Sequence, residues 1–301
     1  MLANFFSKSK PVNFIVLFLL FLSYYIVTLF SKDITFFSIS KELFLYIVLF
    51  SIYIFIVTKN EITFDNSYAF LFYIILTVFF INNITINSVF YANLTILLFL
   101  RKVYSLQSSK NLFHKLFDGG LWLGISFIIE PYTVPFALLL YASTYLHQRF
   151  TYQTLLTPIL GFIPPVLLYF TYCFWYDDLE RFFQLFSWNI PFDYSLYLEN
   201  NYLFSIIFIG LFTLFAILLK TPKALAVLNR FRRNWILLLF HLIISGTAFV
   251  LVPNKSGIEF LFLLFPTSVI LANGLEIFQK KWFADIFIIV FIIASITVFF
   301  L

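Results

Sequence analysis

The sequence predicts an all-α protein, a polytopic bundle of transmembrane helices that forms a single integral membrane domain over residues 1–301. Hydrophobic residues make up 62% of the chain and charged residues only 11%, whereas a soluble domain has roughly 45–50% apolar and about 25% charged residues. The apolar runs are continuous, as in residues 14–30 and 43–57, whereas the strands of a membrane barrel alternate apolar and polar residues. These observations exclude a soluble enzyme, a disordered tail and a DNA-binding domain, and we expect no nucleic-acid partner.

Eleven apolar segments account for the predicted helices. They cover residues 13–30, 43–58, 68–81, 84–100, 119–129, 132–146, 155–175, 202–219, 235–252, 259–274 and 284–301. No small-residue cleavage site follows the first segment, so we interpret it as an uncleaved helix. Two divisions rest on short polar interruptions, which are Asn82, Asn83 and Asn87 in the first case and Glu130-Pro131 in the second.

The distribution of charge supports both divisions. With the N-terminus in the cytoplasm and eleven crossings, 15 of the 19 basic residues fall on the inner side, as the positive-inside rule favours. Fusing either divided pair moves a basic loop to the outer side. The predicted topology is therefore N-in and C-out, with a net charge of +10 inside and −5 outside. The basic inner face suits anionic lipid headgroups, although determination of topology alone also explains it.

Two of the segments are short. Residues 119–129 and 132–146 are too few to cross about 30 Å of hydrocarbon as upright helices. We interpret them as a hairpin shielded by other helices. The break between them carries Glu130, which is either an intramembrane acid at a helix end or a solvated residue at the outer interface.

Other charged residues of the predicted outer side are further candidates for a site. The loop Trp175–Tyr202 alternates acids with aromatic residues, and it contains Asp177, Asp178 and Arg181. Aromatic rings stack on sugar faces and carboxylates bind hydroxyls, so this loop is either the rim of a site for a sugar or lipid-linked ligand, or an interfacial aromatic belt. Lys255 and Glu259, four residues apart, lie on one helix face if the helix begins that early. Their pairing is either structural or functional.

The sequence contains no P-loop, GxGxxG, GxSxG or HExxH motif, and it predicts no cofactor and no metal site. The single cysteine, Cys173, excludes a disulfide within the chain.

Two stretches resemble the GT-C glycosyltransferase superfamily. Residues 117–149, "FDGGLWLGISFIIEPYTVPFALLLYASTYLHQR", resemble its middle helices, and residues 254–276, "NKSGIEFLFLLFPTSVILANGLE", resemble a late helix that ends near a proline, here Pro266. The resemblance implies a GT-C-like layout and transfer of sugar from a polyprenyl-phosphate donor, or from a nucleotide donor in some lineages, with an acid of the first outer loop as the base or metal partner. Asp33 matches that position, and Glu42 matches it less well. The loop Ser31–Glu42 is shorter than in the superfamily and lacks its paired Asp-Glu, so the resemblance leaves two alternatives, a polyprenyl-phosphate-sugar-dependent glycosyltransferase or a catalytically reduced relative.

The opening "FFSKSKPVNF" and the length resemble an uncharacterised family of bacterial polytopic inner-membrane proteins, which implies a location and no activity. Three hypotheses follow. In the first, the protein handles lipid-linked sugar at the outer face, with Asp33 as base, Glu130, Asp177, Asp178, Arg181, Lys255 and Glu259 as substrate-binding residues, and Asp33, Lys255 and Glu259 facing one outer cavity. In the second, it is a non-enzymatic subunit or scaffold with other envelope proteins as partners. In the third, it is a transporter with inverted repeats. Membrane lipid is a partner in all three.

Overall fold

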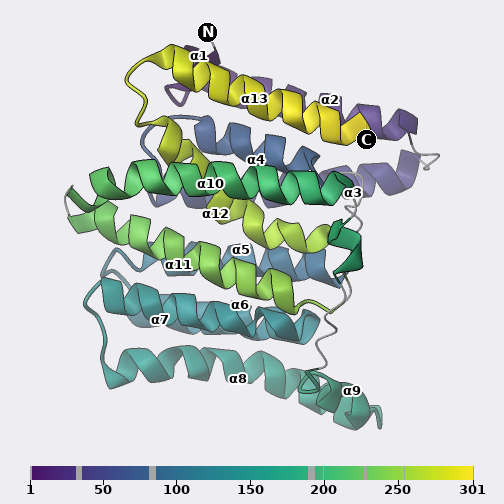
Figure 1. Cartoon of the computed structure of the whole chain (residues 1–301). Coiled ribbons are helices and arrows are strands. Elements are labelled where there is room, and N and C mark those ends of the chain that lie inside the picture. Colours follow the sequence, from purple (N-terminus) through teal and green to yellow (C-terminus); the bar gives the residue numbers. More distant parts are fainter. Residues whose placement is uncertain are drawn as a thin grey trace. The chain divides into compact units, whose positions relative to one another are not determined.

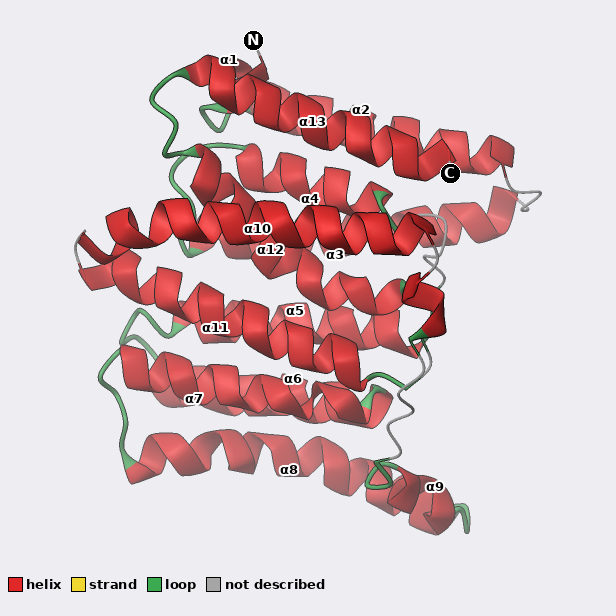
Figure 2. Cartoon of the chain, in the orientation of Figure 1, coloured by secondary structure: helices red, strands yellow, loops and turns green. Residues whose placement is uncertain are grey.

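The computed structural model describes residues 2–31, 36–80, 86–188, 194–198, 200–226, 229–253 and 255–300. Within these ranges the backbone forms helices and turns without any strand, as the all-α prediction requires (Figures 1 and 2). The elements in chain order are α1 (Leu2–Phe6), α2 (Pro11–Ser31), α3 (Phe36–Lys59), α4 (Tyr68–Val78), α5 (Ser88–Ser105), α6 (Leu112–Ile129), η2 (Pro131–Phe136), α7 (Ala137–Leu146), α8 (Tyr152–Trp175), α9 (Leu179–Gln184), η3 (Ser195–Leu198), α10 (Asn200–Ala226), α11 (Asn229–Leu251), η4 (Ile258–Phe260), α12 (Leu261–Leu275) and α13 (Lys281–Phe300).

Each of the eleven predicted apolar segments coincides with one of these helices or, for 132–146 and 259–274, with a 3-10 turn followed by a helix. In the described part of the chain, seven helices are long and apolar enough to cross a membrane. Two further apolar stretches, Pro11–Tyr24 and Tyr68–Val78, are shorter. The protein therefore has the helices of a multi-pass membrane protein, whereas the count of eleven crossings and the N-in, C-out orientation remain predictions.

One short segment is longer than the sequence predicted. The helix expected at 119–129 begins at Leu112, and its 18 residues reach about 27 Å, so that the expectation of a segment too short to span is wrong for α6. The predicted bounds left out Lys115 and Asp118, which are charged and which neighbouring groups hold on the helix. Asp118 accepts from Lys102 at 2.6 Å, and Lys115 donates to the carbonyl of Ser105 at 2.7 Å. The second short segment is short as expected, because α7 has 10 residues.

The chain divides into two compact units. Unit 1 comprises Met1–Thr85, Asp193–Arg232 and Ser256–Leu301, and unit 2 comprises Ile86–Phe192 and Arg233–Lys255. Unit 1 thus contains α1–α4, α10, α12 and α13, and unit 2 contains α5–α9 and most of α11. This division leaves the prediction of one integral membrane domain untested.

The core of unit 1 is built around α12 and α4. Of the stretch Ile258–Leu275, 94% is buried, and all eleven residues of α4 are buried. Both helices are apolar on every side, as a helix enclosed by other helices must be. Tyr53 of α3 anchors this core, because its ring packs edge-on against Phe265 and its hydroxyl lies 2.7 Å from that of Ser268.

The core of unit 2 is the close packing of α6 against α8. A Cβ on Gly120 would lie 2.0 Å from the carbonyl oxygen of Pro158, and one on Gly161 would lie 2.1 Å from that of Phe117. These backbones approach so closely only because both positions are glycine. Gly120 and Gly124 form a small-xxx-small pair on α6, a pattern that favours close packing of helices in membranes.

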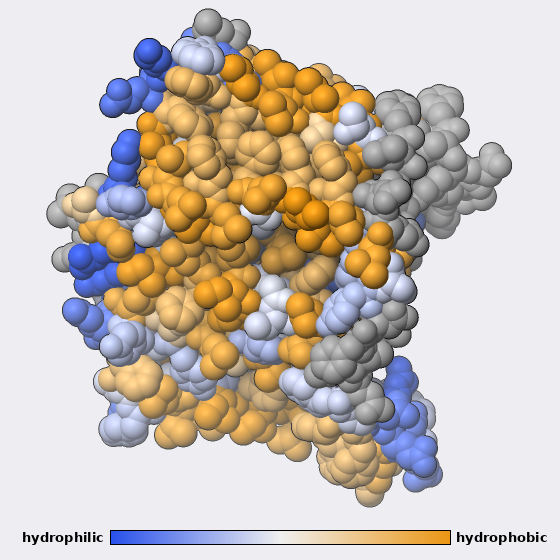
Figure 3. All heavy atoms as spheres, in the orientation of Figure 1, coloured by the Kyte–Doolittle hydropathy of each residue, from blue (hydrophilic) through white to orange (hydrophobic). Residues whose placement is uncertain are grey.

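Apolar side chains also cover much of the molecular surface. On α8 only 17% of the residues are buried, and Leu160, Leu168 and Trp175 are exposed. Figure 3 shows apolar residues over the sides of the helices and hydrophilic residues near helix ends. This surface suits contact with lipid.

Candidate functional site

The predicted site residues belong to different parts of the chain. Asp33, the predicted base, lies outside the described residues. Glu259 belongs to unit 1, whereas Glu130, Asp177, Asp178, Arg181 and Lys255 belong to unit 2. The outer cavity predicted for Asp33, Lys255 and Glu259 therefore stays a prediction.

Glu130 lies at the break between α6 and η2. Pro131 disfavours helical backbone at the preceding residue, and Glu130 has an extended φ of −147°. The break is internally satisfied, because the Glu130 carbonyl accepts from the amide of Thr133 at 3.1 Å and from its hydroxyl at 2.8 Å. Helix α6 therefore ends at this position for a local reason that the sequence already displays.

The carboxyl group of Glu130 is buried, with 8% of the residue exposed, so the interpretation as a solvated loop residue is wrong. It accepts a hydrogen bond at 3.2 Å from the hydroxyl of Ser88, the first residue of α5. Burial raises the pKa of Glu130 above its usual value, and the Ser88 hydrogen bond opposes that rise.

Asp177, Asp178 and Arg181 all have exposed side chains around the short helix α9. Asp177 has a φ of 54°, which turns the chain after α8. An aromatic cluster holds α9 in place, because Phe182 packs against Phe170 at 5.1 Å between ring centroids. The first part of the predicted loop is therefore ordered by packed aromatic rings, here called the aromatic edge (Phe170, Phe182 and Phe186), and its charged side chains point to the surface.

The same aromatic edge continues toward Glu130. Phe186 packs against Phe127 of α6 at 5.6 Å, and Trp188 packs against Tyr132 of η2 at 5.7 Å, both between ring centroids. Tyr132 follows Glu130 by two residues. The end of unit 2 that carries Glu130 is therefore lined by aromatic rings from the α9 region.

Lys255 is engaged at the end of α11. Its ammonium donates to the carbonyls of Phe249 at 2.7 Å and Val250 at 2.9 Å, and it lies 5.4 Å from the centre of the Phe249 ring. The last carbonyls of a helix lack partners within the helix and carry partial negative charge, so a lysine is stabilising there. Burial lowers the pKa of Lys255 to about 8.

Glu259 is fully buried in η4 of unit 1. Its carboxylate accepts from the backbone amide of Ser256 at 3.2 and 3.3 Å and from the hydroxyl of Tyr197. The condition for a shared helix face of Lys255 and Glu259 is not met, because Gly257 turns the chain with a φ of 86° and α12 begins only at Leu261.

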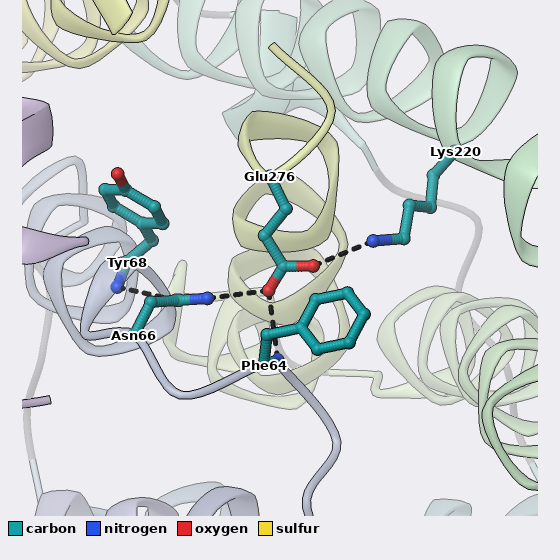
Figure 4. A network of polar contacts seen from close by, with 5 residues as sticks. All are labelled: Phe64, Asn66, Tyr68, Lys220 and Glu276. Carbon is teal, nitrogen blue, oxygen red and sulfur yellow. Dashed lines mark hydrogen bonds and ion pairs between the residues drawn. The ribbon is translucent and has the colours of Figure 1, made fainter. Parts of the chain in front are cut away.

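The sequence analysis missed a buried ion pair in unit 1. Lys220 of α10 donates to Glu276, which follows α12, at 2.7 Å, and their side chains are only 5% and 7% exposed (Figure 4). The second oxygen of Glu276 accepts from the side-chain amide of Asn66 at 2.7 Å and from the backbone amide of Phe64 at 3.1 Å. Every acceptor oxygen of this carboxylate therefore has a donor.

Aromatic rings enclose the lysine of this pair. The ammonium of Lys220 lies 5.1 Å from the ring centre of Phe64 and 5.0 Å from that of Phe231. Burial raises the pKa of Glu276, while Lys220 and Asn66 act in the opposite direction. In the sequence both charges only bounded apolar segments, and no local pattern indicates that they meet.

Among the described residues, no group of three or more His, Cys, Asp or Glu side chains is arranged to hold a metal ion. A family model described as "Family of unknown function (DUF6427)" matches residues 1–301, so the chain belongs to this family. This agrees with the predicted membership of an uncharacterised family. No curated protein and no solved structure matches the chain.

Proposed function

We propose that the protein is a multi-pass protein of the bacterial cytoplasmic membrane that handles a polyprenyl-phosphate-linked sugar at its outer face, as a GT-C-like glycosyltransferase or a catalytically reduced relative of one. The observation that carries this proposal is Glu130, a buried carboxyl group at a helix break in unit 2. Ionisable groups at membrane depth are costly and mark functional sites, and broken helices form binding sites in many membrane proteins.

The surroundings of Glu130 are chemically suited to a sugar. The carboxyl group has Ser88 as a hydroxyl neighbour at 3.2 Å. Tyr132 and Trp188 pack against each other nearby, and aromatic faces bind the apolar faces of sugar rings. Arg181 is exposed on α9 and is the proposed phosphate ligand, with Asp177 and Asp178 beside it as ligands of sugar hydroxyls.

Other predicted residues keep more limited roles in the proposal. Asp33 remains the proposed base. Lys255 already donates to two carbonyls at the end of α11, and it remains a proposed ligand of the phosphate. Glu259 is fully enclosed with Tyr197 and Ser256, which favours a structural role over contact with substrate.

Contacts within unit 1 support the predicted topology. The amide of Ala3 donates to Asp285, and the hydroxyl of Tyr68 donates to the carbonyl of Ala3. Glu276, which pairs with Lys220, also accepts a hydrogen bond from Asn66, two residues before Tyr68. All these residues are predicted to lie on one side of the membrane, so the contacts among them agree with the predicted alternation of these segments.

The test is binding of a polyprenyl-phosphate-linked hexose to the full chain in detergent, measured by native mass spectrometry. Glu130→Gln keeps the size of the side chain and removes its charge and proton-accepting capacity. We expect it to weaken binding at least about tenfold, since a charge-assisted hydrogen bond contributes roughly 1.5–3 kcal/mol.

The matched control is Asp65→Asn, which makes the same chemical change at an exposed acid on the predicted inner side. It should leave binding unchanged. Equal affinities of the wild type and Glu130→Gln would contradict the proposal, as would equal binding of polyprenyl phosphate without its sugar.

A second candidate function is that of a non-enzymatic subunit of an envelope assembly. The exposed apolar side of α8 favours it, because Leu160 and Leu168 offer a continuous surface to a partner helix as well as to lipid. Purification in mild detergent followed by mass spectrometry should then recover a stoichiometric protein partner. Recovery of the chain alone would contradict this second function.

A further inference from the structure

Cationic side chains converge on the end of α5 in unit 2. Lys115 of α6 donates to the carbonyls of Ser105 at 2.7 Å and Ser108 at 3.1 Å. Arg149, which follows α7, donates to the carbonyls of Leu106 at 2.9 Å and Gln107 at 3.4 Å. Two cations from separate elements thus hold the four consecutive carbonyls of residues 105–108, at the end of α5 and just after it.

Two more cations lie at the same end. Lys102, on the last turn of α5, forms an ion pair with Asp118 at 2.6 Å. Arg233 of α11 lies beside Asn234, whose side-chain amide donates to Gln107 at 3.4 Å. Arg149 and Arg233 also act electrostatically on the same histidine, His147, which places both near it.

Positive charge is in excess in this cluster. Lys102, Lys115, Arg149 and Arg233 carry four charges, and Asp118 is the carboxylate that pairs with one of them. His147 adds no charge near neutral pH, because burial and the two arginines lower its pKa to about 4. The carbonyls of a helix end supply only about half a negative charge, so they do not neutralise the remaining cations.

Unused donors remain on the central residues. An arginine has five N–H donors and a lysine has three. Arg149 uses two donors on Leu106 and Gln107, and Lys115 uses two on Ser105 and Ser108. Their anchoring to the chain fixes their positions, so that the other donors are preorganised for the oxygens of an anion.

Exposed aromatic residues flank these cations. Phe113 and Phe117 on the first turns of α6, Tyr145 on α7, and Phe150 and Tyr152 around the start of α8 are 37–73% exposed. Aromatic side chains gather at the level of lipid headgroups. Their presence beside the cations favours a ligand whose phosphate is attached to acyl chains over a free phosphate ion.

We propose that Lys115, Arg149 and Arg233 form a binding site for the phosphate headgroup of an anionic membrane phospholipid. The site lies at the end of unit 2 that is predicted to face the cytoplasm, and it is independent of the sugar site proposed at the outer face. Basic pockets between membrane helices on the cytoplasmic side bind anionic lipid headgroups in this way.

The test titrates phosphatidylglycerol into the full chain in detergent and measures bound lipid by native mass spectrometry, with phosphatidylcholine and inorganic phosphate in parallel. Wild-type protein should bind phosphatidylglycerol in preference to phosphatidylcholine. Arg149→Gln and Arg233→Gln should each weaken that binding by about fivefold, which corresponds to one basic residue near an anionic lipid surface.

Arg233→Gln should leave the fold intact, because Lys115 and Arg149 still hold the carbonyls at the end of α5. Weaker binding by this variant therefore reports the loss of a lipid contact. Lys223→Gln is the matched control, since it removes one exposed positive charge from α10 in unit 1. Three results would each overturn the proposal. These are equal binding of the two lipids, a loss with Lys223→Gln as large as with Arg233→Gln, or full displacement of phosphatidylglycerol by millimolar inorganic phosphate.

Discussion

Buried carboxylates of the described chain each meet a specific donor. Glu130 meets Ser88, Glu259 meets Tyr197 and Ser256, and Glu276 meets Lys220 and Asn66. Burial of an unpaired charge costs several kcal/mol, so these partners are a condition for the carboxylates to be present in such an apolar chain. The three sites differ in how completely the carboxylate is enclosed, and Glu130 has the fewest donors around it.

The Lys220–Glu276 pair should be the most sensitive of the ion pairs to removal of one partner. Lys220→Met leaves the carboxylate of Glu276 buried without its cation, and we expect a loss of about 3–5 kcal/mol in the free energy of unfolding. Denaturation of the full chain in mixed micelles measures it. The control is Lys102→Met, whose partner Asp118 is 41% exposed, and we expect a loss of at most about 1 kcal/mol. Equal losses in the two variants would contradict this ranking.

His147 should make the stability of the protein depend on pH. The pKa of its folded-state imidazole is lowered to about 4 by burial and by Arg149 and Arg233. Between about pH 6.5 and 4 the unfolded chain therefore binds a proton that the folded chain does not, and the free energy of unfolding falls as the pH falls. The contribution amounts to at most about 3 kcal/mol. His147→Gln should remove this contribution, so that the free energies of unfolding of wild type and variant differ by an amount that changes with pH. A difference that stays constant with pH would contradict a role for His147.

At the scale of elements, α6 and α8 depend on glycine for their contact. Gly161 has no room for a Cβ, because the carbonyl oxygen of Phe117 would lie 2.1 Å away. Gly161→Ala should force the two helices apart and lower the free energy of unfolding by about 1–3 kcal/mol. Thermal unfolding in detergent is the measurement.

Gly210→Ala is the control for this contact, since nothing lies within 4 Å of a Cβ at that position in α10. It should be neutral or slightly stabilising, because alanine is the better helix former. A melting temperature of Gly161→Ala equal to that of Gly210→Ala would show that the close approach of α6 and α8 is not required.

At the scale of the whole molecule, the predicted topology places α9 outside and the end of α10 inside. Asp178→Cys should react with a membrane-impermeant maleimide in intact cells, whereas Lys223→Cys should react only after permeabilisation. Background labelling should be low, because the native Cys173 is buried. Labelling of both variants in intact cells would contradict the N-in arrangement with eleven crossings.

Hydropathy along the sequence was enough to predict the all-α class and the approximate positions of the eleven apolar segments. Hydropathy and helix breaks are local properties, and the break at Glu130 follows from Pro131 alone. The start of α6 at Leu112 could not be predicted from local sequence. Lys115 and Asp118 are accommodated on this helix by Ser105 and Lys102, which belong to α5. Tertiary structure also decided that Glu130 is buried, that Lys220 meets Glu276, and that Lys115 and Arg149 share the end of α5. In each case the energy of a charge depends on groups distant in sequence, and only the packing of the helices brings those groups together.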